Sequence, residues 1–370
     1  MPSHRSSATP LALIFAALIV YASLYPFESW RDQGINPLSF LTAPWPRYWS
    51  QFDLIANFLG YMPLGFLVTL ALLRTWRLPM PLLWTVAAGS LLSLALEALQ
   101  SYLPQRVPQL SDWLLNSAGV AAGAALAVSL EKMGAIDHWN RFRERWFVRD
   151  ARSALVLLAL WPAALLFPPA APLALGQVRH RLHQSVNALV EATPFATFID
   201  EPGAYLLPLS NLGELICVAL GFLIPCLLAY SVTLGWHRRL MLWVGACATA
   251  LVGSSLSAAM SFSPAHAWGW LSFSAQVGLA LGAGVALLAL VLPRRGCWGL
   301  LVAALVWQLS LINGAPETPY YAQTLQSWEQ GRFIRFHGLA QWLGWLWPYA
   351  ALGYVLARLS GREQAQASES

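Results

Sequence analysis

Charged side chains are scarce in this 370-residue sequence, where Asp, Glu, Lys and Arg together make up 11%. A soluble domain carries about 25% charged residues. Hydrophobic residues account for 57% of the chain, and the mean hydropathy is +0.53. A chain of this composition cannot cover itself with a water-compatible surface, so it predicts a polytopic membrane protein. The formal net charge of +5 is therefore no evidence for a nucleic-acid partner.

The sequence also lacks the patterns typical of disulfide, metal or nucleophile chemistry. It has four cysteines, Cys217, Cys226, Cys247 and Cys297. Their spacing shows no pairs, which argues against a disulfide framework and a CxxC metal site. There is no Ser-His-Asp order, no phosphate-binding loop and no metal-ligand spacing. His180 and His183 lie three residues apart in an amphipathic segment, which is more typical of a solvated pair than of a zinc site. The sequence predicts no metal and no cofactor.

Apolar runs dominate the chain, and ten of them approach the 17–25 residues that a membrane-spanning helix needs. They fall at about 9–25, 53–73, 81–103, 112–131, 153–172, 209–234, 240–262, 268–292, 298–315 and 338–358. We therefore predict an all-α, polytopic transmembrane helical protein of about ten helices. The first run also fits a secretory signal peptide cleaved near Ala22 or Ser23, although an uncleaved helix is the preferred interpretation.

The distribution of Lys and Arg predicts that both termini face the cytoplasm (N-in/C-in). With a cytoplasmic N-terminus, 15 of the 22 basic residues lie in inner segments and 7 in outer ones, as the positive-inside rule requires. The longest basic run, 141–152, interleaves arginines with Phe142, Trp146 and Phe147. It predicts an amphipathic helix on anionic lipid of the inner leaflet. A nucleic-acid site is disfavoured, because the run is short and tethered to the bilayer.

One polar stretch joins the third and fourth apolar runs. Its polar residues are Glu97, Gln100, Arg106, Asp112 and Asn116. An ionisable residue in a membrane segment is a functional-site candidate by default. On the third run, Ser90, Ser93, Glu97 and Gln100 follow at spacings of 3, 4 and 3, so they share one helix face. We expect this face to lie in a seam between helices near the outer surface, because lipid would leave it unpaired.

The flanking residues extend the polar stretch. Asp112 fits the N-cap of the fourth helix, and Gly119 and Gly123 form a small-xxx-small packing face. Upstream, Asp53 and Asn57 lie one turn apart at the start of the second run.

The stretch ExxQxxLPxRVPxLSDWxxNSxGxxxG (97–123), with DLIANFLGYMPLGF (53–66), resembles the polar core of the VanZ-like family of bacterial integral membrane proteins. The resemblance covers about residues 11–131. It implies a multi-pass protein of the bacterial inner (cytoplasmic) membrane with a role at the cell envelope, because the family's first-described members are linked to glycopeptide resistance. This chain has about six helices more than the short members, so the resemblance does not imply resistance itself.

The pattern begins again at residue 153. GVAAG (119–123) aligns with GLALG (278–282), which makes Gly278 and Gly282 a second packing pair, and FDLIANFLGY (52–61) aligns with FHGLAQWLGW (336–345). These matches predict parallel repeats of 4+4+2 helices. The second copy lacks the polar residues. The predicted parts are a VanZ-like four-helix unit (1–131), a basic amphipathic cytoplasmic linker (132–152), a degenerate four-helix unit (153–292) with an outer amphipathic segment (173–208), two C-terminal helices (293–358) with an outer loop (316–337), and a disordered cytoplasmic tail (359–370).

The predicted function is binding at a pocket that faces the periplasm. Its residues are Asp53, Asn57, Glu97, Gln100, Arg106, Asp112 and Asn116. It would bind a lipid-linked or polysaccharide precursor of the cell envelope, and the protein would act as an accessory factor. Arg106 suits a phosphate or carboxylate. Two alternatives stay open: a membrane-embedded enzyme with Glu97 or Asp112 as its acid or base, and a scaffold whose polar cluster only packs helices. Membrane lipid is an expected partner and nucleic acid is not.

Overall fold

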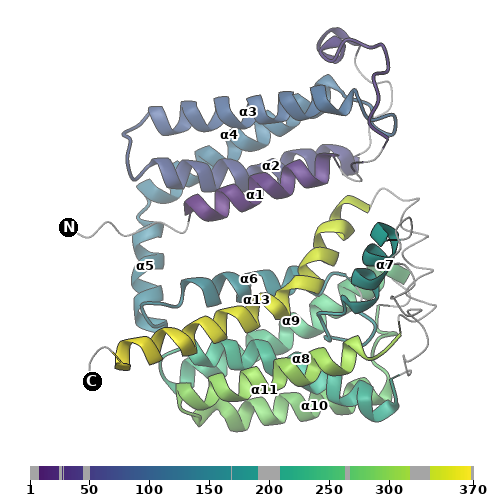
Figure 1. Ribbon diagram of the computed structural model, residues 1–370. Coiled ribbons are helices and arrows are strands. Elements are labelled where there is room, and N and C mark those ends of the chain that lie inside the picture. The colour runs from purple at the N-terminus through teal and green to yellow at the C-terminus, as the bar shows by residue number, and fades with distance from the viewer. Residues whose placement is uncertain are drawn as a thin grey trace. The chain divides into compact units, whose positions relative to one another are not determined.

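The computed structural model describes residues 8–24, 27, 29–44, 51–167, 169–190, 209–262, 267–316 and 334–367. Within these ranges every regular element is a helix, and the one β-bridge joins Phe147 and Thr233. The chain divides into two compact units, residues 1–142 and 143–370 (Figure 1). Each unit is described by itself.

The N-terminal unit is built from four apolar helices and the start of a fifth. They are α1 (Ala8–Leu24), α2 (Gln51–Leu72), α3 (Met80–Gln100), α4 (Leu110–Lys132) and α5 (Ala135–Trp146), with a 3-10 turn η1 (Ser39–Thr42) after α1. The buried core of this unit combines apolar side chains of α1, α2, α3 and α4. Val120 is its most buried member and lies between α2 and α3, against Gly65 and Gly89.

Glycines bring α2 and α4 together backbone to backbone. A Cβ atom built on Gly119 would lie 2.1 Å from the carbonyl oxygen of Phe58, and one on Gly123 would lie 1.9 Å from that of Met62. Only a residue without a side chain permits this approach, which is the means by which membrane helices gain close packing. The predicted packing role of this glycine pair is confirmed, and α2 and α4 form the most extensive helix pair of the unit.

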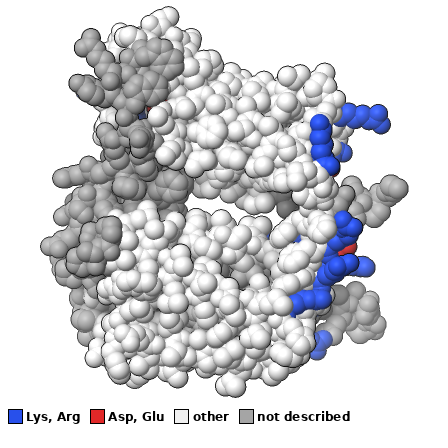
Figure 2. Space-filling view, turned by 180° about the vertical axis from the view of Figure 1, so that it is seen from behind, with Lys and Arg blue, Asp and Glu red and all other residues white. Residues whose placement is uncertain are grey.

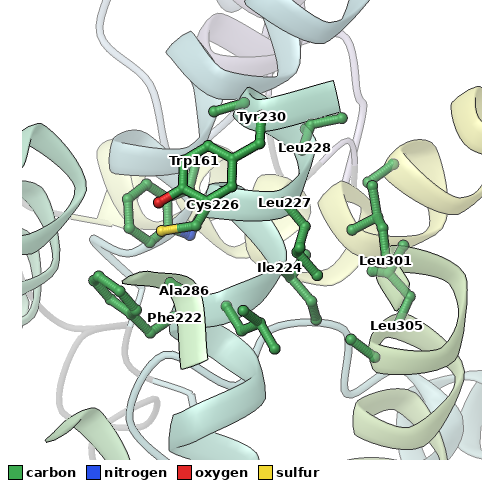
Figure 3. Close-up of a cluster of buried hydrophobic side chains, with 14 of the residues drawn as sticks. Trp161, Phe222, Ile224, Cys226, Leu227, Leu228, Tyr230, Ala286, Leu301 and Leu305 are labelled. Atoms are coloured by element: carbon green, nitrogen blue, oxygen red, sulfur yellow. The ribbon is translucent and has the colours of Figure 1, made fainter. Parts of the chain in front are cut away.

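The C-terminal unit surrounds one almost fully buried helix. Its helices are α6 (Arg152–Ala164), α7 (Arg179–Val190), α8 (Asn211–Val232), α9 (Trp236–Phe262), α10 (Phe273–Leu288) with η4 (Ala289–Val291), α11 (Arg294–Asn313) and α13 (Ile334–Ala367). Helix α8 starts at the N-cap Ser210, whose hydroxyl accepts from the Gly213 amide. It then packs against α6, α9, α10 and α11, and Figure 3 shows its Phe222, Ile224 and Leu227 among the side chains of this core.

The second predicted glycine pair also packs as expected. Cβ atoms on Gly278 and Gly282 of α10 would each lie 2.5 Å from a carbonyl oxygen of α8, those of Leu215 and Ala219. Thus in each unit a GxxxG pair lies in close contact with the backbone of another helix: α4 packs on α2, and α10 packs on α8. This agreement supports the predicted repeat, which itself stays a prediction.

The predicted span at 153–172 is wrong in its second half. Helix α6 ends at Ala164, and residues 169–178 are non-helical although Leu173, Ala174 and Leu175 are buried. Irregular backbone at membrane depth is tolerated where protein buries it and satisfies its polar groups. Side chains of α9, α11 and α13 do so here. The Leu166 carbonyl, just before this segment, accepts from the Ser257 hydroxyl at 2.9 Å.

Among the described residues, seven helices are long and apolar enough to cross a membrane: α2, α3, α4, α8, α9, α10 and α11. Helices α1 and α6 are apolar but shorter. This confirms the predicted all-α class with the character of a polytopic membrane protein. The number of ten spans and the N-in/C-in topology stay predictions. Helix α13 continues to Ala367, into the segment predicted as a disordered tail, whereas most of the predicted outer loop, 317–333, lies outside the described residues.

Candidate functional site

The polar face predicted on α3 is real, and its partners come from neighbouring helices. Asn116 of α4 donates from Nδ2 to the Ser93 hydroxyl at 2.9 Å. One turn earlier along α3, the Ser117 hydroxyl donates to the Ser90 hydroxyl at 2.9 Å. The Trp113 indole nitrogen donates to the Ser90 carbonyl at 3.1 Å. These bonds tie α3 to α4 along the seam in which the sequence placed them.

Glu97 and Gln100 lie at the end of the same face, and both are buried. Glu97 is 4% exposed, and its Oε2 accepts the backbone N–H of Gln109 at 3.1 Å. Gln100 donates from Nε2 to the carbonyl oxygen of Ser23 in α1, at 3.0 Å. The acid therefore fixes the start of α4, and the amide fixes the end of α1. A carboxylate is costly to bury unless hydrogen bonds compensate it. The bond from the Gln109 amide provides such compensation, and it ties the end of α3 to the start of α4.

Asn116 retains an unused acceptor in the middle of this network. It is 4% exposed, and its Oδ1 has no hydrogen-bond partner among the described residues. Nearby, the Tyr61 hydroxyl of α2 hydrogen-bonds the side chains of Ser93 and Ser23 and lies close enough to Glu97 to interact electrostatically. An unsatisfied buried acceptor costs about 1–3 kcal/mol, which makes this oxygen the place where a donor from outside would gain most.

Asp112 does not cap α4, which corrects the sequence prediction. The helix begins three residues earlier than this cap predicts, with Gln109 as its N-cap in extended conformation and Asp112 in the first turn. There the partly buried carboxylate still lies at the positive end of the helix dipole. Arg106 is partly buried in the loop that leads into α4, where its amide bonds the Leu103 carbonyl at 2.9 Å. Both residues thus lie in the segment between Gln100 and Asn116, partly buried.

Of the two predicted site residues in α2, the structure describes the side chain of Asn57 and not that of Asp53. Asn57 is partly buried and precedes Tyr61 by four residues, so both lie on one face of α2. The side chain of Asp53 lies outside the described residues.

The loop between α1 and α2 makes contacts at this end of the unit. The Arg31 amide donates to the Tyr102 carbonyl at 3.0 Å, and Gln33 donates from Nε2 to the Ser101 carbonyl at 2.6 Å. Phe40 of η1 is buried, and η1 contacts α4. The described part of the loop after α1 therefore covers the end of α3 beside the polar cluster.

The sequence also missed a polar cluster in the C-terminal unit, around residues 173–178. Gln308 donates to the Leu175 carbonyl at 3.2 Å, and Asn313 and Tyr349 both donate to the Gly176 carbonyl, at 2.9 and 3.1 Å. These bonds satisfy the irregular backbone that follows α6. No spacing rule signals them, because donors and acceptors are more than 130 residues apart.

The arrangement defines a helical membrane protein whose N-terminal unit encloses a polar, partly charged cluster at one end of its helices. The VanZ/LLP1 family model matches residues 5–131, which is the segment that contains this cluster, so the chain carries a VanZ-like unit over its first third. The family resemblance predicted from the sequence is confirmed over that part of the chain. Neither the curated proteins nor the solved structures contain a match.

Proposed function

We propose that the VanZ-like unit binds a cell-envelope component, a lipid-linked or polysaccharide precursor, and that the protein acts as an accessory factor in the bacterial inner membrane. The site is the cluster formed by Asp53, Asn57, Glu97, Gln100, Arg106, Asp112 and Asn116. The observation that carries the proposal is the unpartnered Oδ1 of Asn116, buried among groups that are otherwise paired.

The chemistry of the ligand follows from the groups that the cluster offers. Asn116 Oδ1 and the Glu97 carboxylate accept hydrogen bonds, which suits the hydroxyl or amide groups of a sugar. Arg106 at the border of the cluster suits a phosphate or carboxylate, which a guanidinium binds in bidentate fashion. A phosphorylated sugar on a lipid carrier offers both kinds of group.

The expected orientation rests on the basic residues of the same unit. Arg74 and Arg77 lie in the turn between α2 and α3, and Lys132 ends α4, all at the ends opposite to the polar cluster. By the positive-inside rule these ends face the cytoplasm. The cluster would then face the periplasm.

The test is native mass spectrometry of the detergent-purified full chain, with Arg106→Ala and Glu97→Gln beside the wild type. Arg77→Ala and Glu131→Gln are matched controls, because both residues are exposed at the opposite end of the unit and the substitutions make the same charge changes. We expect an anionic lipid or glycolipid adduct on the wild type and the controls that both site variants lose.

Folded site variants with unchanged adducts, or a wild type without any adduct, would overturn the proposal. The scaffold alternative would then stand, since bonds such as that from Gln100 to Ser23 tie the helices together in any case. An enzyme would instead show turnover of the bound precursor that disappears in Glu97→Gln.

A further inference from the structure

One end of the C-terminal unit concentrates positive charge. Nine arginines lie there: Arg143, Arg145, Arg149, Arg152, Arg238, Arg239, Arg294, Arg295 and Arg358. Among the residues whose side chains the structure describes, the acids at this end are Glu144 and Asp150, and Asp150 pairs with Arg358 at 3.2 Å. Within the C-terminal unit, Figure 2 shows Lys and Arg gathered at one end, with almost no acidic residue among them.

Contacts between distant segments show that these arginines share one end of the unit. The Val148 amide donates to the Val232 carbonyl at 3.0 Å, and the Leu234 amide donates to the Trp146 carbonyl at 2.8 Å, so the chain between α5 and α6 lies along the turn between α8 and α9. Buried Arg239 of α9 donates to carbonyl oxygens at the end of η4 and just beyond it, 2.8 and 2.7 Å away. The ends of α8 and α10 and the starts of α6, α9 and α11 therefore meet here.

Arg238 is fixed at this end while part of its guanidinium stays available. Its Nη1 donates to the carbonyls of Leu234 and Arg145, and its Cζ lies 5.9 Å from the ring centroid of Trp146. The hydrogen bonds of Arg238 to other described residues use Nη1 alone. They cap a carbonyl at the C-terminal end of α5 and one just after α8, and they leave Nε and Nη2 for an anion. Arg145 contributes only its backbone carbonyl to these bonds, and its side chain is exposed.

An apolar stripe starts next to Arg238 and follows α9. Met241, Val244, Val252 and Leu256 share one face of this helix and are 47–65% exposed. Fifteen residue steps separate its first and last members, or about 22 Å along the helix axis, which exceeds the hydrocarbon depth of one leaflet, about 15 Å. Trp236, 52% exposed, lies at the arginine end, where an aromatic ring suits the headgroup level.

We propose that this end of the C-terminal unit is a binding site for an anionic phospholipid, with Arg238 and Arg145 on the phosphate and an acyl chain along the α9 stripe. Charge selects the lipid class. The excess of arginine attracts a net negative headgroup such as phosphatidylglycerol, and each basic residue near the surface contributes to that preference. The proposal is independent of the ligand of the N-terminal unit, because it rests on residues of the other unit.

The test is lipid binding by the full chain in nanodiscs of phosphatidylcholine with increasing phosphatidylglycerol, with the retained lipid counted by native mass spectrometry. The variants are Arg145→Gln and Arg238→Gln. Arg179→Gln is the control, because this exposed arginine begins α7, near the C-terminal end of α11 and therefore at the opposite end of the unit. We expect each site variant to weaken retention of phosphatidylglycerol about fivefold, the control to retain it, and added salt to weaken binding by the wild type.

Arg145→Gln protects the test against a folding defect, because only the backbone of Arg145 takes part in the hydrogen bond from Arg238. Equal retention of phosphatidylcholine and phosphatidylglycerol, or unchanged retention in both site variants, would overturn the proposal. Soluble glycerol phosphate should not displace the lipid. If it does so at equal concentration, the stripe on α9 takes no part and the site is a simple anion site.

Discussion

Replacing Gly123 by alanine tests whether the contact between α2 and α4 builds the N-terminal unit. The added Cβ would lie 1.9 Å from the Met62 carbonyl oxygen and 2.9 Å from the backbone nitrogen of Phe66. Real Cβ atoms essentially never approach closer than 3.0 Å. The helices must therefore separate by about 1 Å or more, and no rotamer change can relieve the clash because backbone faces backbone.

The expected cost exceeds the benefit that alanine brings to a helix. Overpacking of a well-packed interior costs about 1–3 kcal/mol, and the lack of any movable side chain places Gly123→Ala at or above the upper end. Alanine gains about 0.5–1 kcal/mol over glycine inside a helix. The net loss of stability is about 2 kcal/mol or more. Asn116 lies two turns away on the same helix, so the separation also loosens its hydrogen bond to Ser93.

The assay is reversible unfolding in detergent micelles, followed by helical circular dichroism, for the wild type, Gly123→Ala and Gly60→Ala. Gly60 lies on α2, and nothing stands within 4 Å of the position of its Cβ. The Gly60 variant should therefore be unchanged or up to about 1 kcal/mol more stable. The reasoning fails if Gly123→Ala is as stable as the wild type, or if both variants lose the same stability.

Three further substitutions address the C-terminal unit. Arg239→Met should destabilise it by about 2–5 kcal/mol in chemical unfolding, because two carbonyls lose their charged donor. The control Arg295→Met, at an exposed position, should change stability by less than about 0.5 kcal/mol. Similar losses in the two variants would contradict the burial of Arg239. Asn313→Ala should speed hydrogen exchange of the Val178 and Arg179 amides, because both donate to the Asn313 Oδ1 atom. Unchanged exchange would show that Asn313 does not protect these amides. Ser210→Ala should cost about 1 kcal/mol, as loss of an N-cap does, and no change in the unfolding midpoint would show that the cap of α8 contributes nothing.

The sequence was a good guide wherever the signal is local. Apart from α6 and the end of α13, the apolar runs predicted the apolar helices of the described residues within a few positions, because length and hydropathy of a segment suffice for a membrane helix. The polar face of α3 followed from spacing alone, since helical periodicity fixes which residues share a face. The glycine pairs 119/123 and 278/282 were found as packing positions for the same reason.

The sequence failed where a competing partner decides the structure. Asp112 has the residue type of an N-cap, yet α4 begins earlier, and Glu97 of α3 takes the amide of the actual N-cap, Gln109. The run after Ala164 is apolar enough to continue as a helix, yet donors from α11 and α13 satisfy an irregular backbone instead. Neither partner is near in sequence, so no periodicity could reveal it.

Composition and periodicity by themselves determined that this chain is an all-α membrane protein, and the resemblance of two short motifs to a known family placed a VanZ-like polar stretch in its first third. Both properties lie in short segments of the chain. Only the tertiary structure decided which polar groups pair, that Asn116 keeps an unused buried oxygen, and that arginines from four separate segments meet at one end of the C-terminal unit. These features depend on contacts between residues far apart in the chain, whose geometry is set when the helices pack and not before.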